Sequence, residues 1–160
     1  MVQNFKEDYD HGKQSEEISY PDLIKLFKRD NLKHDPYCFA HFDFFDDEYM
    51  IELKTRDDVK VIDGEFHYKT RAGRNIILDT LYFDAPKMRF AFQHNKRLEK
   101  KKRFFIVWKC NKEYYYWEIN WDKKDYYVED QENDWGKGFQ KRDVINVKVS
   151  SIKKLNSFNP

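Results

Sequence analysis

Aromatic and branched residues fill the segment 37–56 in two runs, and this pattern predicts a β-hairpin. The two runs flank Asp46-Asp47, and aspartate is tolerated in tight turns. A two-residue turn at these aspartates sets the register of the hairpin. That register places six apolar residues on one continuous face, in the pairs Phe44–Tyr49, Phe42–Ile51 and Ala40–Leu53.

The opposite face of the same hairpin collects polar side chains. Alternation along the strands places His41, Asp43, Glu52 and Lys54 there. Two carboxylates on one strand pair favour a divalent metal ion, because hard cations bind carboxylate oxygens and a nearby lysine can neutralise charge or orient a water. His41 lies opposite Glu52, either as an added ligand or as a hydrogen-bond partner of its acidic neighbour. A solvated outer face of an edge hairpin is the alternative to a metal site.

An Asp on one strand, a turn and Glu-x-Lys on the next strand resemble the core of the PD-(D/E)xK nuclease superfamily. Asp43 matches the motif aspartate, and Glu52-Leu53-Lys54 matches Glu-x-Lys, whereas Phe42 stands where the motif has proline. An acid followed two positions later by lysine also occurs at 58–60, 99–101 and 122–124. Only the copy at 52–54 lies in an apolar strand with an acid upstream on the matching face, and this context gives the motif its weight.

The resemblance implies a metal-dependent nuclease that hydrolyses phosphodiester bonds, with DNA expected before RNA as the substrate. Asp43 and Glu52 would bind Mg²⁺ or Mn²⁺, with help from the Leu53 carbonyl oxygen and from a glutamate on the preceding helix. Lys54 would orient the attacking water or stabilise the phosphorus. The resemblance also implies a restriction-endonuclease-like core in which a helix precedes the hairpin and a second helix follows it.

The preceding helix is predicted over residues 18–28. Its apolar residues follow the spacing i, i+3, i+4 and i+7: Tyr20, Leu23, Ile24 and Phe27. Pro21 suits a first turn, or a kink if the helix begins earlier, and residues 1–13 are expected to be loose. Within the resemblance, Glu17 is our candidate for the extra metal-binding glutamate and Glu16 is the second choice. Acids in a first turn also favour the helix dipole without any chemistry.

Residues 56–75 are predicted to form a charged loop. Its basic residues include Arg56, Lys69 and Arg71, which we expect to contact phosphates, although most charged loops are only solvated. A strand follows over residues 76–83.

A second helix is predicted from the cap Asp84 to about Lys100, with an apolar side formed by Met88, Ala91, Phe92 and Leu98. The resemblance implies a lysine near its start, and Lys87 occupies that place. The basic run 96–103 is expected to touch a nucleic-acid backbone, or to be a solvated helix end with cations favoured by the dipole.

The remaining segments predict further strands. They are a central strand at 103–110, a Tyr- and Trp-rich strand at 113–121, a short edge strand at 126–129, a polar loop at 131–142, a late strand at 144–149 and a short turn or helix at 150–155. This order of elements predicts one α/β domain with a mixed sheet flanked by helices. The nuclease-like core would span about residues 12–120, and residues 121–160 would extend it.

Composition narrows the class of protein. Aromatic residues make up 18% and charged residues 37% of the 160 residues, which indicates a single globular domain rather than a disordered chain. The net charge is only +1, so any binding of nucleic acid must come from local patches. Cys38 and Cys110 show no metal-binding spacing, which favours a reducing, intracellular location: cytoplasm or nucleus, or a host cell if the source is viral. We expect no membrane contact, because no apolar run approaches the length that spans a bilayer.

Two other functions are compatible with the same fold. A nucleic-acid-binding module without chemistry would show salt-dependent binding that survives Glu52→Ala. A protein-interaction module would show no affinity for nucleic acid and would form a dimer or complex through its aromatic sheet. The oligomeric state is open, a homodimer included.

Overall fold

A computed structural model describes residues 5–35, 42–97, 101–134 and 139–158, and its side chains are described over 11–35, 42–97, 101–130 and 143–158. The predicted roles of His41, Cys38 and Leu98 therefore fall outside the described residues. No helix in the described part of the chain has both the length and the apolar character needed to cross a membrane.

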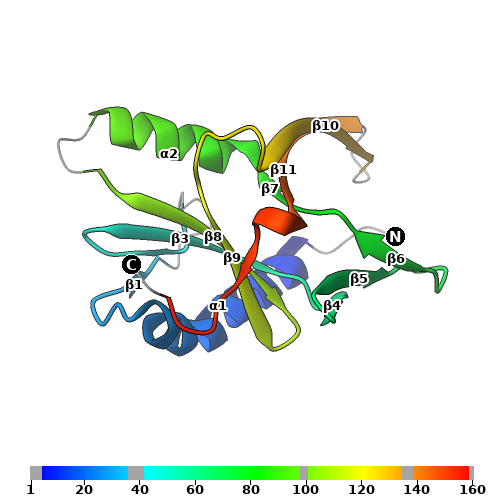
Figure 1. Cartoon of the computed structure of the whole chain (residues 1–160), viewed down its shortest axis with the longest axis horizontal. Helices are drawn as coiled ribbons and strands as arrows, with labels where there is room; N and C mark the ends of the chain where they lie inside the picture. The colour runs from blue at the N-terminus through cyan, green and yellow to red at the C-terminus, as the bar shows by residue number, and fades with distance from the viewer. Residues whose placement is uncertain (1–4, 36–41, 98–100, 135–138, 159–160) are drawn as a thin grey trace.

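A mixed six-stranded sheet forms the centre of the fold (Figure 1). In spatial order its strands are β1 (Lys33–His34), β2 (Phe44–Phe45), β3 (Tyr49–Thr55), β8 (Arg103–Cys110), β9 (Glu113–Glu118) and β12 (Lys153–Lys154). β3 and β8 run parallel, and the other neighbours in this sheet are antiparallel. Because parallel strands require a long crossover, the chain between β3 and β8 has room for helix α2 (Ala85–Arg97).

Two smaller sheets flank the centre. One contains β10 (Tyr126–Asp134), β11 (Phe139–Lys148) and β7 (Thr80–Asp84), and the other contains β4 (Val59–Ile62), β5 (Glu65–Lys69) and β6 (Asn75–Leu78). Helix α1 (Phe5–Phe27) begins the described chain, and a short 3₁₀ helix, η1 (Val149–Ser151), precedes β12. The prediction of an α/β fold with a mixed sheet and helices is confirmed.

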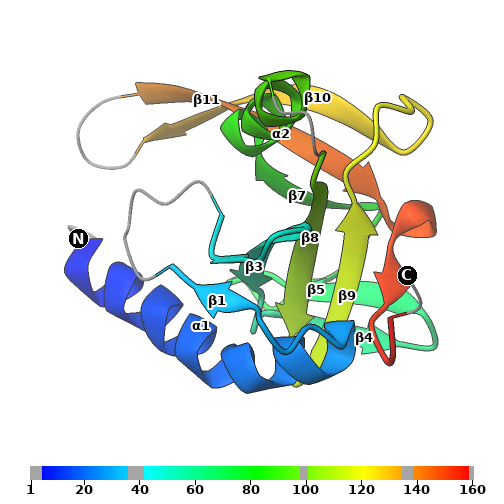
Figure 2. The same ribbon diagram turned by 90° about the vertical axis from the view of Figure 1, so that its left-hand side faces the viewer.

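The helices lie on opposite faces of the central sheet (Figure 2). Strand β8 alternates between two cores: Phe105 packs with the α1 side, whereas Phe104 and Trp108 pack with α2 and β7. This burial on both faces is what the sequence predicted for residues 103–110, and the strand has the predicted bounds. The same alternation decides which side chains of the parallel neighbour β3 face α2.

Helix α1 is much longer than predicted. It begins at Phe5 rather than Ile18, so the prediction of a loose segment over 1–13 was wrong for the described residues. Leu23 and Phe27 are buried as the apolar stripe requires. Pro21 lies inside the helix, which is the alternative that an earlier start allows.

The hairpin forms, but with a register shifted by two residues. Phe44 pairs with Ile51, not with Tyr49. The turn therefore has Asp47 and Glu48 at its centre, because the carboxylate of the buried Asp46 accepts the backbone N–H groups of Glu48 and Tyr49 at 2.8 and 2.7 Å. The register differs from the prediction because Asp46 accepts backbone hydrogen bonds at the start of the turn and does not occupy its centre.

Phe42 does not lie with Phe44 on the predicted apolar face. It packs in the core beside α2, whereas Phe44 packs beside α1. Strand β2 contains only Phe44 and Phe45, so strict alternation does not extend back to Phe42.

The segment predicted as a charged loop, residues 56–75, instead contains β4, β5 and the start of β6. Val59 and Phe66 fix this small sheet by burying their side chains in the core. The strand predicted over 76–83 is divided at Asp79, whose carbonyl oxygen accepts the Val149 N–H at 2.9 Å. The sequence pattern does not reveal this sheet, because the charged residues of β4, β5 and β6 alternate with the few apolar residues that anchor the sheet.

The C-terminal third also contains more strand than predicted. β10 and β11 extend through most of the predicted loop 131–142, and the predicted strand 113–121 ends at Glu118. In α2 the side chain of Phe92 is exposed, whereas Phe90 lies against Phe42 and Phe104, so the predicted apolar side was partly wrong. Helix α2 must cover both the central sheet and β11, which widens its apolar face.

Candidate active site

Asp43 lies beside the middle of strand β3. Its Oδ2 accepts the backbone N–H of Leu53 at 2.8 Å. Continuing the β2–β3 register by one position places Asp43 opposite Glu52, the place that sequence analysis assigned to His41. In a strand the N–H and C=O of one residue point to the same edge. The Leu53 carbonyl therefore points toward the edge where Asp43 lies.

Glu52 is the buried centre of the cluster, with 4% of its surface exposed. Lys54 Nζ lies 3.1 Å from its Oε1, and Lys87 Nζ lies 3.2 Å from its Oε2. Lys54 follows two positions later on the same face of β3, whereas Lys87 comes from the first turn of α2. Although Lys87 is close, Oε2 receives no hydrogen bond of acceptable geometry from the described residues, so this oxygen can still accept a bond.

Helix α1 presents Glu16, not Glu17, to the cluster. Glu16 shares a hydrogen bond with Asp43, and its Oε2 lies 3.0 Å from His34 Nε2. Glu17 and Ile18 are exposed on the other side of the helix. The preferred candidate Glu17 is therefore replaced by the second choice. The apolar stripe held the signal: one helical turn before Tyr20 comes Glu16.

His34 is a neighbour that sequence analysis did not single out. It lies on β1, and its ring stacks on Phe44 with centroids 5.0 Å apart and an interplanar angle of 28°. Tyr20 packs against the same imidazole at 5.9 Å. Two aromatic rings and the Glu16 carboxylate therefore fix its orientation. A two-residue edge strand has no periodic pattern that could have predicted it.

The crowding of carboxyl groups changes their titration. Burial, then the hydrogen bond and charge of Glu16, raise the pKa of Asp43 to about 7. Burial, then the charge of Asp43, raise the pKa of Glu52 to about 7, although Lys54 and Lys87 oppose the shift. Burial also raises the pKa of Glu16. The cluster therefore retains protons near neutral pH that separate carboxylates would release.

Lys54 is surrounded by negative charge. Burial alone would lower the pKa of Lys54, but Glu52, Asp84 and Asp43 together raise it. Asp84 ends β7, immediately before the α2 helix, where sequence analysis placed it as a cap. Lys54 is therefore an ammonium donor at neutral pH and not a proton acceptor.

The donor set suits a hard divalent cation. Oxygens of Asp43, Glu52 and Glu16 lie close to the edge toward which the Leu53 carbonyl points, and Mg²⁺ and Mn²⁺ prefer such ligands. Among the described residues no three His, Cys, Asp or Glu side chains stand together in a metal-coordinating arrangement. The oxygens of Glu52 instead face two ammonium groups. Metal binding would require Lys87 to move from Oε2.

The four predicted phosphate contacts lie in three places. Lys87 lies in the cluster, whereas Lys69 and Arg71 are exposed at the β5–β6 turn. Arg56 is held locally: its Nε lies 3.1 Å from Asp58 Oδ1, and its guanidinium lies 5.4 Å from the Tyr82 ring centre.

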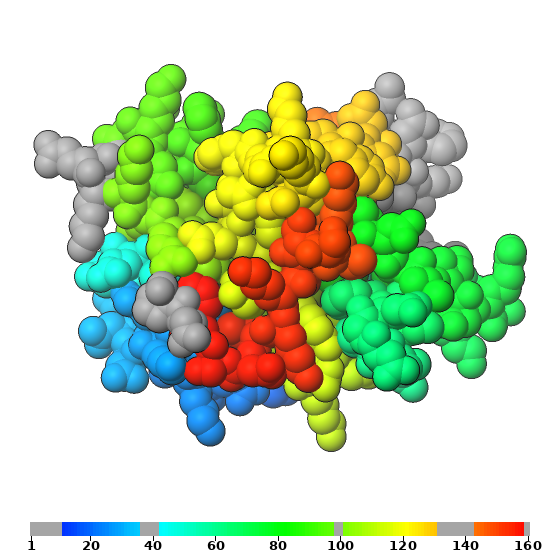
Figure 3. Space-filling model, viewed as in Figure 1, coloured from blue at the N-terminus to red at the C-terminus, as the bar shows by residue number. Residues whose placement is uncertain are grey.

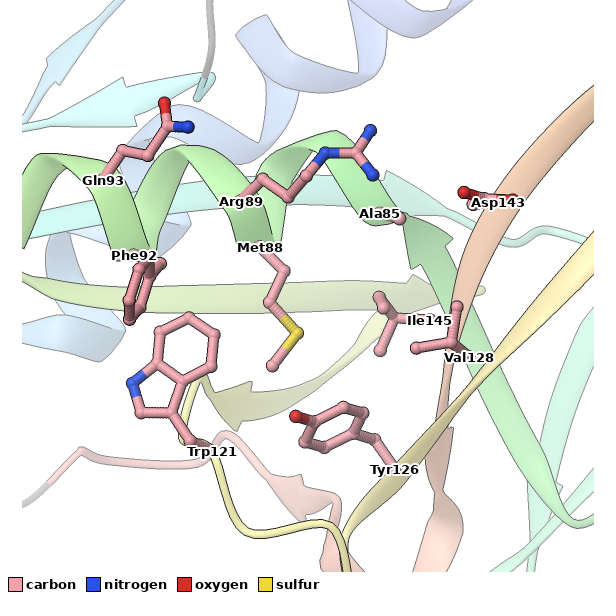
Figure 4. A pocket seen from close by; sticks show the side chains of 10 residues that line it. All are labelled: Ala85, Met88, Arg89, Phe92, Gln93, Trp121, Tyr126, Val128, Asp143 and Ile145. Carbon is pink, nitrogen blue, oxygen red and sulfur yellow. The ribbon is translucent and has the colours of Figure 1, made fainter.

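A separate apolar pocket of about 420 Å³ lies on another flank of α2 (Figure 4). Met88 and Phe92 of the helix face Trp121 and Tyr126 across it, and the Phe92 and Trp121 rings meet edge to face at 5.3 Å. It shares no residue with the carboxylate cluster. The concave apolar site and the titrating site are therefore different places on this protein.

Comparisons of the chain with protein-family models, curated proteins and solved structures gave no match.

Proposed function

We propose that the protein is a metal-dependent nuclease of the PD-(D/E)xK type, which hydrolyses phosphodiester bonds in DNA or, as second choice, RNA. The observation that carries the proposal is the convergence of Asp43, Lys54 and Glu16 around the buried Glu52. The element order supports a restriction-endonuclease-like core: α1 precedes the β2–β3 hairpin, and α2 leads to β8, which is parallel to β3.

Each residue has a role that its surroundings support. Asp43, Glu52, Glu16 and the Leu53 carbonyl would hold Mg²⁺ or Mn²⁺. The bound metal would lower the pKa of a water and stabilise charge that develops on the phosphate. Lys54 remains an ammonium, so it donates hydrogen bonds to the attacking water or to a phosphate oxygen. Lys87 would leave Glu52 and pair with a phosphate.

The direct test is cleavage of supercoiled, linear and single-stranded DNA, and of RNA, in Mg²⁺ or Mn²⁺. Asp43→Asn and Lys54→Met should each lower the rate at least about a hundredfold, the scale of one lost electrostatic contact in a transition state. Lys112→Met is the control, because Lys112 is exposed in the β8–β9 turn. Unchanged rates in Lys54→Met, with circular dichroism unaltered, would end the assignment.

One observation favours a second function. Glu52 is already balanced by two ammonium groups, as a structural ion cluster without a metal would be. In that case the protein is a nucleic-acid-binding module without chemistry. Calorimetry with Mn²⁺ separates the two: the nuclease takes up metal and loses this uptake in Asp43→Asn, whereas the binding module takes up none and still binds nucleic acid.

A further inference from the structure

The turn between β5 and β6 concentrates positive charge. Residues 69–75 contain three cations and no acid: Lys69, Arg71 and Arg74. All three are exposed, and none forms an ion pair with another described residue. The turn forms the green projection at the right of Figure 3. Unpaired like charges this close repel each other, so an anionic partner would lower their energy.

The acids of the same small sheet lie outside the turn. Asp63 and Glu65 lie at the β4–β5 turn, which is the opposite end of the sheet because β4 and β5 are antiparallel. Asp57 and Asp58 precede β4 at the same end as the basic turn, but they have other partners: Asp58 Oδ1 lies 3.1 Å from Arg56 Nε, and Asp57 Oδ2 lies 3.4 Å from His11 Nε2. The three cations of the turn therefore remain available to an anionic partner.

The basic turn has a defined structure. The Thr70 N–H donates to the Arg74 carbonyl at 2.8 Å, and the Thr70 carbonyl and hydroxyl accept the N–H groups of Gly73 and Arg74 at 2.9 and 3.1 Å. Gly73 has φ +82°, where a side chain would be strained. The backbone that carries the cations is therefore ordered before any partner binds, which lowers the entropic cost of binding.

The sheet is fixed to the core and connects to the candidate site. Asn111 Nδ2 donates to the Val59 carbonyl at 2.7 Å, and the Phe66 and Tyr115 rings lie 5.0 Å apart. From the turn, β6 and β7 lead back to Asp84 beside Lys54. At about 3.3 Å per residue this path spans at most about 33 Å. That is about 10 base pairs at about 3.4 Å each.

We propose that the β5–β6 turn is a second, non-catalytic contact to the phosphodiester backbone of the substrate. Its contribution to binding grows as the polynucleotide extends from the cleavage position and is complete at about 10 base pairs, by the length estimate above. This inference rests on the proposed nuclease function. The β5–β6 turn would set the length of substrate that binds most tightly.

The test uses fluorescent DNA hairpins with stems of about 6 to 30 base pairs, and matching RNA hairpins, in buffer with EDTA so that no cleavage occurs. The turn variant Lys69→Gln/Arg71→Gln/Arg74→Gln is compared with Lys112→Gln/Lys123→Gln/Lys124→Gln. The second triple removes the same charge from exposed positions outside the turn.

For wild type, affinity should rise with stem length and level off above about 10 base pairs. The turn variant should lose this rise, bind the longest stems about tenfold more weakly and show a log–log salt slope smaller by about 2 to 3. The control triple should keep the rise. Whichever polymer shows the effect, DNA or RNA, is the substrate class.

An equal loss in both triples, or an unchanged length dependence in the turn variant, would overturn the second contact. Cleavage assays keep this result separate from the proposed function. If wild type and the turn variant cleave long stems equally in Mn²⁺, the nuclease proposal is retained and the proposed contact is rejected. If neither protein cleaves any stem while the length-dependent binding persists, the nuclease proposal is rejected and the proposed contact is retained.

Discussion

Lys87 Nζ lies 3.2 Å from Oε2 of Glu52, although β4, β5, β6 and β7 all separate the two residues along the chain. The same carboxylate receives Lys54 at 3.1 Å on its other oxygen. A divalent cation bound by Glu52 must therefore compete with an ammonium group. This competition can be measured.

Lys87→Met should bind Mn²⁺ about tenfold more tightly than wild type by calorimetry, because the variant lacks the competing cation beside Oε2; tenfold is about 1.4 kcal/mol. Cleavage should nevertheless slow, since the phosphate loses a positive partner. Arg89→Met is the control, because Arg89 lies on the same helix at the rim of the apolar pocket. Equal Mn²⁺ affinity in wild type and Lys87→Met would mean that Lys87 does not occupy the cation position.

The two adjacent glutamates of α1 provide a matched pair. Glu16→Gln should weaken Mn²⁺ binding at least about tenfold, the loss typical of groups in or next to a metal site. Glu17→Gln should leave Mn²⁺ binding unchanged, because that side chain is exposed. Calorimetry of both variants decides the point. If Glu17→Gln weakened Mn²⁺ binding and Glu16→Gln did not, Glu17 would be the metal-binding glutamate, as the sequence first suggested.

His34 should act through Glu16. His34→Ala removes the partner 3.0 Å from Glu16 Oε2 and should weaken Mn²⁺ binding about tenfold or more. His34→Gln offers an amide donor at a similar position and should restore part of this loss. Urea unfolding of both variants shows whether a change in stability, rather than the loss of the His34 contact, accounts for weaker Mn²⁺ binding. If His34→Gln and His34→Ala bind Mn²⁺ equally weakly, the imidazole only fills space between Tyr20 and Phe44.

Stability of the metal-free protein should fall as pH rises from about 4 to about 7. Asp43 and Glu52 have pKa values raised to about 7 in the folded protein, against about 4 when unfolded. The folded state binds more protons in this interval, so stability is fully present below about pH 4 and is lost as the groups ionise. Thermal unfolding in EDTA across pH 4.5 to 8 measures the slope.

Asp43→Asn should flatten part of this pH slope and raise stability at pH 8 by more than about 1.4 kcal/mol, the value of one unit of pKa difference. The amide oxygen can still accept the Leu53 N–H, and the amide can donate to Glu16. Mn²⁺ should act in the opposite sense on wild type, stabilising it more as pH rises. A wild-type pH profile that rises between pH 4.5 and 7 in EDTA contradicts the raised pKa values.

The hairpin register should depend on Asp46. Asp46→Ala removes the acceptor of two backbone N–H groups and the partner of Arg29 Nε at 2.6 Å, so unfolding free energy should fall by about 2 to 4 kcal/mol. Asp47→Ala is the control and should change it by less than about 0.5 kcal/mol, because Asp47 is exposed. Urea unfolding measures both. Equal effects would favour a turn centred on Asp46-Asp47.

The local pattern of apolar and polar residues was sufficient to predict several elements of the fold. The strand over 103–110 was predictable because its apolar residues occupy both faces, and the hairpin was predictable because aromatic and branched residues flank a turn. The register was not predictable, because the same carboxylate can occupy the centre of a turn or accept backbone N–H groups at its start. Glu52-x-Lys54 survives either register, since strand alternation keeps both residues on one face.

The sequence alone determined that Glu52 and Lys54 share a face of one strand, because residues two apart in a strand always do. It also determined that an acid lies upstream at Asp43. Only the tertiary structure decided that Asp43, Glu16, His34 and Lys87 surround this pair. Their positions depend on where α1 begins, how the hairpin turns and how β3 and β8 come to pair in parallel, and packing between distant segments sets these choices, not local periodicity.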